Sequence, residues 1–263
     1  MKCTVVIPTY NERPNIEQII AEILSQGPEY HVLIVDDNSP DGTGEIVRGL
    51  QEQNARVSVI RRPGKNGLGT AYMEGLTQAL AGGADFVAQM DADFSHAPSC
   101  LPQFLARAQE TGADIVIGTR YGRGGAIRNW PLARHVLSRC GNFYARVLLG
   151  SRFTDYTSGF MLHRASALRE LQFCEFGCSN FAFLLEMKVE YARLGARTVE
   201  MPIEFVNRVR GASKISPHVV WEAFYIVLHI FRRHGRARFG PAALPEPADA
   251  QLATPEAPQP KVQ

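Results

Sequence analysis

The first half of the chain alternates short apolar runs with longer amphipathic segments, and this alternation limits the possible folds more than any other feature. The pattern predicts strands over residues 4–8, 31–35, 57–61, 85–90 and 114–118, and helices over 14–24, 43–53, 67–81 and 98–111. Strands that alternate with helices in this way form parallel βαβ units with right-handed crossovers. We therefore expect an α/β fold in which helices flank a mostly parallel sheet.

Polar residues cluster where three of these strands end. The clusters cover residues 9–12, 36–41 and 91–96. Parallel strands end at one edge of their sheet, and ligands of such sheets bind in the crevice beyond that edge. The three clusters are therefore expected to form a single site.

Asp91 and Asp93 follow the fourth predicted strand and stand two residues apart. At a strand end, both carboxylates can turn toward one hard divalent cation, Mg²⁺ or Mn²⁺, that also binds substrate phosphates. A metal held there neutralises a diphosphate and helps it to depart as a leaving group. The alternative is a solvated acidic turn that caps the helix beginning at Pro98. The position at the expected ligand edge favours the metal.

Asp36 and Asp37 follow the second predicted strand. Asp37 is expected to turn inward and to accept hydrogen bonds from a ribose or a base, although the run from Asn38 to Gly42 also predicts a turn that Asp41 shapes. No GxGxxG motif follows the first strand, and the glycines at 64–69 lack the order of a phosphate-binding loop. The first observation argues against a dinucleotide-dependent dehydrogenase, and the second indicates a tight turn before a helix rather than a phosphate-binding loop.

Basic residues gather in two places. Five arginines and no acidic residue lie between Gly118 and Cys140, and the first of them, Arg120, follows the fifth strand directly. A second group, Arg208, Arg210 and Lys214, follows the predicted strand at 197–205. Arginine is suited to bidentate phosphate binding, whereas the alternative for the first group is a solvated basic loop. Together with the carboxylate pair, the two groups predict two phosphate subsites, one bound to metal and one to arginine.

Composition excludes several classes of protein. A net charge of +2 gives no reason to expect nucleic-acid binding, and five cysteines without CxxC spacing argue against disulfides and a zinc site. The N-terminal residues do not resemble a signal peptide, and no apolar run reaches the ~18 residues that a membrane-spanning helix needs. We therefore expect a cytoplasmic protein that does not cross a membrane by itself.

The alternation weakens after about residue 120. Strands are predicted at 158–163 and 197–205, and a helix at 181–194. An amphipathic helix is predicted within 217–239, and its apolar face carries Val220, Phe224, Val227, Leu228 and Phe231. With its terminal arginines, this helix fits the membrane interface, so that the protein would associate peripherally with the cytoplasmic face. The alternative is a helix packed on the core. Residues 240–263, rich in proline and alanine, are expected to be disordered.

Six motifs in this order resemble one family. They are PTYNE at 8–12, VDDNSPDGT at 35–43, DADFSH at 91–96, GTRY at 118–121, TSGF at 157–160 and RVRGASK at 208–214. Over about residues 2–216 the chain resembles the dolichol-phosphate mannosyltransferases of glycosyltransferase family 2. The resemblance implies a GT-A-type, Rossmann-like catalytic domain over 1–216. It also implies an inverting transfer of mannose from GDP-mannose to polyprenyl phosphate, which gives polyprenyl β-D-mannosyl phosphate.

The resemblance also assigns roles to residues of the matching motifs. The nucleoside is expected at Pro8, Tyr10, Glu12, Val35 and Asp37. The metal and the diphosphate are expected at Asp91 and Asp93, with Ala92 beside the sugar nucleotide. Phosphates are expected at Arg120, Arg208 and Lys214. Asp93 and Arg120 are the expected catalytic residues, and Arg120, Arg134 and Ser138 are the candidates for the acceptor phosphate. Ser95 stands where some relatives have a glutamine as a further metal ligand.

Three alternatives concern substrate and mechanism. Relatives that use another nucleotide sugar, such as UDP-glucose, share the first three motifs. The motifs therefore leave both GDP-mannose and another nucleotide sugar as donors. A nucleotide-binding module without turnover is a further alternative, against which the carboxylate pair and both basic groups speak. No general base is expected for a phosphate acceptor, because a phosphate monoester with a second pKa of about 6 is already an anion at neutral pH. His96 is the alternative base. No protein partner is indicated.

Overall fold

The computed structural model describes residues 1–150, 153–171, 182–207 and 217–235. The predictions for Arg208 and Lys214, and for the tail at 240–263, lie outside the described residues. The amphipathic helix predicted within 217–239 is described as far as residue 235.

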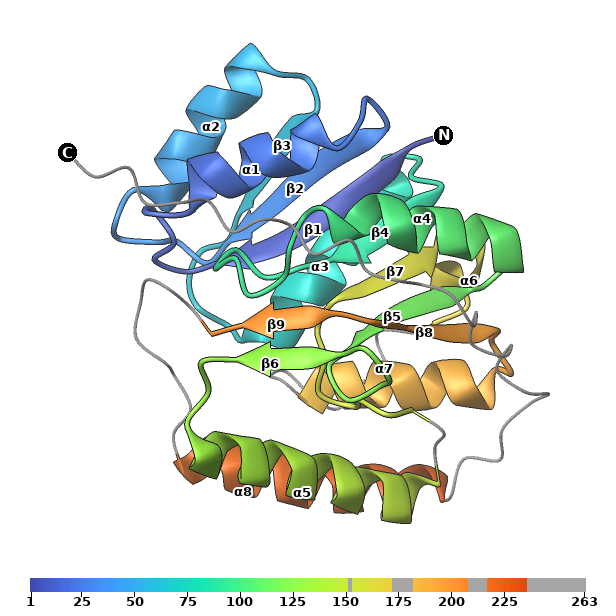
Figure 1. The fold of residues 1–263 in the computed structure, drawn as a ribbon. Coiled ribbons are helices and arrows are strands. Elements are labelled where there is room, and N and C mark those ends of the chain that lie inside the picture. The colour runs from blue at the N-terminus through green and yellow to red at the C-terminus, as the bar shows by residue number, and fades with distance from the viewer. Residues whose placement is uncertain (151–152, 172–181, 208–216, 236–263) are drawn as a thin grey trace.

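The centre of the molecule is one seven-stranded sheet with the order β3-β2-β1-β4-β7-β5-β8 (Figure 1). Its strands are β1 (Cys3–Thr9), β2 (Tyr30–Asp36), β3 (Val57–Arg61), β4 (Phe86–Gln89), β5 (Ile115–Thr119), β7 (Met161–Arg164) and β8 (Thr198–Pro202). All neighbours pair in parallel except β7, which runs antiparallel between β4 and β5. The expectation of a mostly parallel α/β fold is confirmed.

Helices cover both faces of this sheet. The helices of the described ranges are α1 (Ile16–Ser25), α2 (Thr43–Gln53), α3 (Leu68–Ala81), α4 (Cys100–Thr111), α5 (Leu132–Leu149), α6 (Ala165–Arg169), α7 (Ala182–Arg193) and α8 (Pro217–His234). The apolar sides of α1, α2 and α4 pack on one face, and those of α3, α5, α7 and α8 contribute to the core on the other. The strands between these two cores are buried on both sides, which explains their continuous apolar runs.

The stretch between β5 and β7 is more ordered than its basic composition suggested. It contains β6 (Ala126–Arg128), which pairs in parallel with β9 (Glu204–Val206) in a separate two-stranded sheet, and then the 18-residue helix α5. The alternative of a solvated basic loop is therefore wrong for the part that α5 covers. An ion pair between Arg128 and Glu204 joins the two short strands.

The two 18-residue helices, α5 and α8, lie side by side at one end of the molecule (Figure 1). Val227 and Ile230 of α8 are buried in the core, and Phe231 is half-buried against it. The predicted apolar face of α8 is therefore not wholly available to a membrane, because Val227 packs internally. The side chains of Val220 and Phe224 lie outside the described residues.

Helix α5 instead turns large apolar side chains toward solvent. Leu132 is 78% and Phe143 69% exposed, and Val136 and Val147 are exposed on the same side of the helix. Their spacing of four, seven and four residues places them in one stripe, which we call the α5 stripe. None of the described helices is both long enough and apolar enough to cross a bilayer.

Candidate active site

The three polar clusters meet at one edge of the sheet, as their positions predicted. β1 lies between β2 and β4, and its register pairs Pro8 with Val35 and Thr9 with Asp36. On the other side, Val6 of β1 pairs with Gln89, the last residue of β4. The loops that carry Tyr10, Asp37 and Asp91 therefore leave neighbouring strands.

The two aspartates after β2 have different surroundings. Asp36 lies within the turn: its carboxylate accepts hydrogen bonds from the Thr9 hydroxyl at 3.0 Å and from the Ser39 amide at 3.0 Å. The Asp37 carboxylate instead accepts from Arg62 Nη1 at 2.6 Å. Burial raises the pKa of Asp37, and Arg62 opposes that effect. Arg62 is itself buried, and it holds Asp37, the residue predicted to bind the nucleoside. No sequence motif marks Arg62.

The other residues predicted to bind the nucleoside flank Asp37. Val35 is buried in the sheet, so its side chain supports the site from below, whereas Pro8 and Tyr10 are half-buried. The ammonium group of Lys65 lies 4.6 Å from the centre of the Tyr10 ring. The Glu12 carboxylate accepts a hydrogen bond from Asn15 at 3.0 Å. Tyr10 and Glu12 are thus both partly exposed in the segment that follows β1.

Three residues after these strands adopt a left-handed backbone. Asn11, Asn38 and Phe94 have φ angles of 60°, 56° and 58°. Asparagine tolerates this conformation, but a bulky aromatic residue rarely adopts it. The strain at Phe94 lies in the turn that carries Asp91 and Asp93, and such strain concentrates at functional sites.

Asp91 and Asp93 differ in exposure within that turn. The Asp91 side chain is 38% exposed, with Oδ1 lying 3.5 Å from the Tyr72 hydroxyl. Asp93 is buried, with Oδ1 accepting a hydrogen bond from the Ser95 amide at 3.0 Å. Ala92 between them is buried. One carboxylate is thus fixed within the turn and the other is partly exposed to solvent.

This pair fits a divalent cation whose remaining ligands come from a substrate. Within the described ranges, no three His, Cys, Asp or Glu side chains are grouped to hold a metal by themselves. Two carboxylates are the donor set typical of Mg²⁺ bound through substrate phosphates, and Mn²⁺ also prefers carboxylate and water oxygens. Ser95, 2% exposed, acts here through its backbone amide on Asp93.

His96 lies against the turn that carries the carboxylate pair, where its Nδ1 accepts a hydrogen bond from the Asp91 amide at 3.5 Å. Its ring is buried, stacks on Phe160 at 5.0 Å between centroids and meets the edge of Phe205 at 5.3 Å. Burial lowers the pKa of His96 to about 4. The imidazole is therefore neutral at neutral pH and packs as an aromatic ring.

Arg120 is held by a partner that sequence reasoning missed. Its Nε and Nη2 donate to the two carboxylate oxygens of Asp155 at 2.7 and 2.8 Å, and Nη2 also donates to the Thr157 hydroxyl at 2.6 Å. Burial raises the pKa of Asp155, but Arg120 and, to a smaller extent, Lys188 lower it, so that the pKa lies below its usual value. The remaining amino group, Nη1, makes no hydrogen bond within the described part of the chain.

The two other candidates for the acceptor phosphate lie on α5 and reach toward Arg120. The guanidinium carbon of Arg134 is 4.1 Å from the centre of the Trp130 ring, and that of Arg120 is 5.5 Å from the same ring. The Ser138 hydroxyl bonds to the Tyr121 hydroxyl at 2.7 Å. The structure thus gathers the three candidates around Trp130 and Tyr121.

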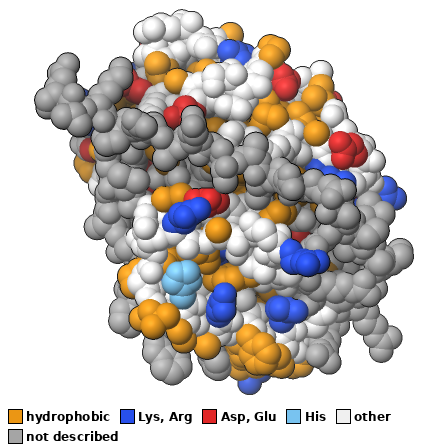
Figure 2. Space-filling model, viewed as in Figure 1, with side chains coloured by type: hydrophobic (Ala, Val, Ile, Leu, Met, Phe, Trp, Pro, Cys, Tyr) orange, Lys and Arg blue, Asp and Glu red, His pale blue; other side chains and the backbone are white. Residues whose placement is uncertain are grey.

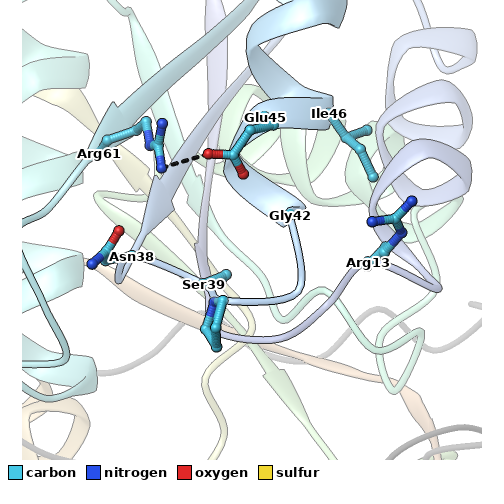
Figure 3. Close-up of a pocket in the computed structure, with 8 residues that line it drawn as sticks. Arg13, Asn38, Ser39, Gly42, Glu45, Ile46 and Arg61 are labelled. Carbon is cyan, nitrogen blue, oxygen red and sulfur yellow. Dashed lines mark ion pairs between the residues drawn. The ribbon is translucent and has the colours of Figure 1, made fainter.

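A separate cavity of about 730 Å³ opens beside the turn after β2 (Figure 3). Arg13, Asn38, Gly42, Glu45 and Arg61 contribute to its lining. Its basic groups already have partners: Arg61 pairs with Glu45 at 2.7 Å, and Arg13 donates to the Asp41 carbonyl at 2.9 Å. None of the predicted site residues lines this cavity, so it flanks the strand-end site without forming it.

Comparison with known proteins agrees with this geometry. The sequence profile of glycosyl transferase family 2 matches residues 4–172. An undecaprenyl-phosphate mannosyltransferase from Micrococcus luteus is 40% identical over 223 residues, which cover 85% of this chain and 91% of the relative. A polyprenol monophosphomannose synthase from Mycolicibacterium smegmatis is 40% identical over 224 residues, which cover 85% of this chain and 84% of the relative.

Solved structures share the fold at lower identity. A mannosyltransferase from Pyrobaculum calidifontis, in complex with GDP-Man and Mn²⁺, aligns with a TM-score of 0.59 and 20% identity over 90% of this chain and 66% of that one. Glucosyl-3-phosphoglycerate synthase from Mycobacterium tuberculosis, in complex with Mn²⁺, UDP and phosphoglyceric acid, aligns with a TM-score of 0.62 and 21% identity over 90% of this chain and 80% of that one. The profile match and the close relatives together show that the chain belongs to glycosyl transferase family 2 and is a glycosyltransferase.

Proposed function

We propose that this enzyme transfers mannose from GDP-mannose to a polyprenyl phosphate, with inversion, to give a polyprenyl β-D-mannosyl phosphate. The observation that carries the proposal is that a carboxylate pair follows β4 and Arg120 follows β5, two strands that end at the same edge of the sheet. Both curated relatives described above are named for a mannosyl group and a polyprenyl phosphate. A site for two phosphate-bearing substrates is what such a reaction requires.

The donor is assigned to the crevice between the loops of β1, β2 and β4. Asp37, oriented by Arg62, accepts hydrogen bonds from the nucleoside. Tyr10 and Glu12 flank the nucleoside, and Pro8 and Val35 lie under it. Asp91 and Asp93 would hold a divalent cation, Mg²⁺ or Mn²⁺, which would supply positive charge to a leaving diphosphate. Arg208 and Lys214, outside the described residues, are proposed to contact the same phosphates.

The acceptor phosphate is assigned to the arginine side of the site. Arg120 Nη1, Arg134 and Ser138 surround the place where two anionic groups must approach each other. A phosphate monoester needs no base to become a nucleophile at neutral pH, because its second pKa is about 6. The arginines therefore serve to offset charge repulsion and to orient the attacking oxygen.

The membrane surface is assigned to the α5 stripe, in place of much of the α8 face that the sequence suggested. Exposed Arg139 and Arg146 accompany the exposed apolar residues of the same helix. Figure 2 shows hydrophobic and basic side chains together along the lower part of the molecule, where Figure 1 places α5. An apolar stripe with flanking arginines is typical of a helix that lies in a lipid interface beside anionic headgroups. Arg134 and Ser138 lie about half a turn around the same helix from this stripe, on the side of Trp130 and Tyr121, so a lipid phosphate would have to pass the helix to reach them.

Transfer from labelled nucleotide sugars tests the reaction directly. The protein is incubated with polyprenyl phosphate in vesicles and with GDP-mannose, UDP-glucose or GDP-glucose, each with Mg²⁺, Mn²⁺ or a chelator. We expect a labelled lipid from GDP-mannose alone, and only with metal. Product from UDP-glucose would instead keep the reaction class and change the donor. Nucleotide binding without any lipid product would support a binding module without turnover.

A further inference from the structure

The segment 154–158 carries the partner of Arg120 and is fastened from two sides. Asp155 within it is fully buried and binds Arg120 through its side chain, and its carboxylate also accepts from the Arg120 amide at 3.2 Å. The position of the Arg120 guanidinium therefore depends on how firmly this segment is held.

Lys188 of α7 holds the carbonyl side of the segment. It is fully buried, and Nζ donates to the carbonyl oxygens of Asp155, Tyr156 and Ser158 at 3.0, 2.9 and 2.7 Å. An ammonium group has three donors, and all three are used on this one loop. Burial lowers the pKa of Lys188 to about 7, which shows the cost of placing a cation there.

Glu200 of β8 holds the amide side of the same segment. Its carboxylate accepts hydrogen bonds from the Thr154 amide at 2.8 Å and from the Asp155 amide at 3.4 Å. The Thr154 hydroxyl bonds in turn to that of Thr119, the residue before Arg120, at 2.5 Å. A half-buried carboxylate thus binds the N–H groups where the segment begins, and a fully buried amino group binds the C=O groups that come after them.

We propose that Lys188 and Glu200 are positioning residues that fix Asp155 and, through it, hold Arg120 ready for the acceptor phosphate. The acceptor part of this inference rests on the proposed function. Buried charges contribute little net stability compared with apolar residues of the same size, so a role in orienting another group accounts for their presence better than stability does. Neither residue touches the carboxylate pair, so donor binding is expected to be independent of both.

Trp130 reports on Arg120 without any substrate. Its ring lies 5.5 Å from the Arg120 guanidinium, and the chain has only one other tryptophan, Trp221. In a Trp221→Phe background, the emission of Trp130 is calibrated against Arg120→Ala in the same background, because Arg134 also lies over this ring, at 4.1 Å. Lys188→Met and Glu200→Ala are introduced into this background, with Glu200→Gln as the conservative variant because it keeps one acceptor oxygen. Lys2→Met is the matched control, since Lys2 also binds a carbonyl, that of Gly82, far along the chain from this loop.

The expected results separate the two halves of the site. Lys188→Met and Glu200→Ala change Trp130 emission and lower kcat/KM for the polyprenyl phosphate about 10- to 100-fold, as expected for a lost charge-assisted hydrogen bond. GDP binding by calorimetry stays within about twofold, an energy change below RT. Glu200→Gln recovers most of the loss, and Lys2→Met behaves as the parent.

Two outcomes would overturn the inference. One is unchanged Trp130 emission and unchanged acceptor KM in folded Lys188→Met or Glu200→Ala; the other is an equal loss of GDP and acceptor binding, which indicates a purely structural role. If Lys188→Met does not fold, the Glu200 pair of variants decides by the same measurements. If the parent transfers nothing to polyprenyl phosphate, the proposed function fails. The emission of Trp130 still tests whether Lys188 and Glu200 fix the position of Arg120.

Discussion

Both carboxylate oxygens of Asp155 accept hydrogen bonds from the side chain of Arg120, although the two residues stand 35 positions apart in the chain. The pair is buried, and each charge depends on the other for compensation. Removing one partner of a buried pair leaves an uncompensated charge, which costs more than removing both.

Arg120→Ala is therefore expected to abolish transfer and also to reduce the free energy of unfolding by about 3–5 kcal/mol. Arg120→Ala combined with Asp155→Asn removes the stranded charge, so stability recovers in part while activity does not. Denaturant unfolding and the lipid-transfer assay measure the two effects. Transfer that survives in either variant would contradict the assignment of Arg120 to the phosphates.

Asp93→Ala is expected to abolish transfer because the donor diphosphate loses a metal-bridging carboxylate. Asp93 lies in a turn after β4, outside the strands and helices, so the circular dichroism spectrum should be unchanged. Calorimetric titration of Mn²⁺ in the presence of GDP checks the cause, since the metal-dependent heat should disappear. Asp85→Ala, at the other end of β4, is the control. Full activity of the parent in a chelator would disprove the metal role.

The sequence predicted the first half of the fold well because its signals are local. The predicted helix at 43–53 and strand at 57–61 coincide with α2 and β3, since β-branched runs and turn residues mark their ends. The strand-end clusters followed from the alternation itself, because parallel strands deliver their carboxyl ends to one edge. The candidates at Asp37, Asp91 and Asp93 needed no long-range information.

The rest depends on contacts between distant segments. Helix α5 escaped prediction because Leu132 and Phe143 face solvent, which breaks the usual pattern of apolar residues inside. Asp155 carries no motif that points to Arg120, and a lysine in a helix, such as Lys188, suggests a solvated position. These residues become meaningful only when the chain has folded around them.

Polar substitution of the α5 stripe is expected to weaken membrane binding. Leu132→Ser, Phe143→Ser and Val147→Ser together remove three exposed apolar side chains, and full burial of each is worth about 1.5–3 kcal/mol. Even partial insertion therefore predicts a loss of more than about tenfold in partitioning to anionic vesicles, measured by sedimentation. Leu194→Ser, an exposed site just after α7, is the control. Equal vesicle binding by the triple variant would show that α5 does not contact lipid.

Acid is expected to destabilise the fold through His163. This ring is fully buried between Gln89, at 2.8 Å, and the Tyr191 hydroxyl, at 3.0 Å, and burial lowers its pKa to about 3. An unfolded histidine titrates near pH 6.5, so the unfolded state binds more protons between about pH 3 and 6.5. Stability is thus greatest above this window and falls by about 1.4 kcal/mol per pH unit for this group as the pH decreases.

His163→Asn isolates that contribution. The variant is less stable at pH 7 because two hydrogen bonds are lost, but its stability should decline less steeply between pH 6.5 and about 4. Unfolding in denaturant at several pH values gives both slopes. Parallel slopes for the parent and the variant would show that His163 does not titrate in this range.

His96 is expected to contribute packing rather than proton transfer. Its ring lies against Phe160 and Phe205, and its pKa of about 4 makes it a weak base beside a phosphate that is already ionised. His96→Phe, which keeps an aromatic ring in this place, should therefore retain most of the turnover, and His96→Ala should lose mainly stability. The pH dependence of kcat/KM should rise through about pH 6, with the second ionisation of the acceptor, in the parent and in His96→Phe alike. A loss of several orders of magnitude in His96→Phe, with GDP binding intact, would instead identify His96 as the base.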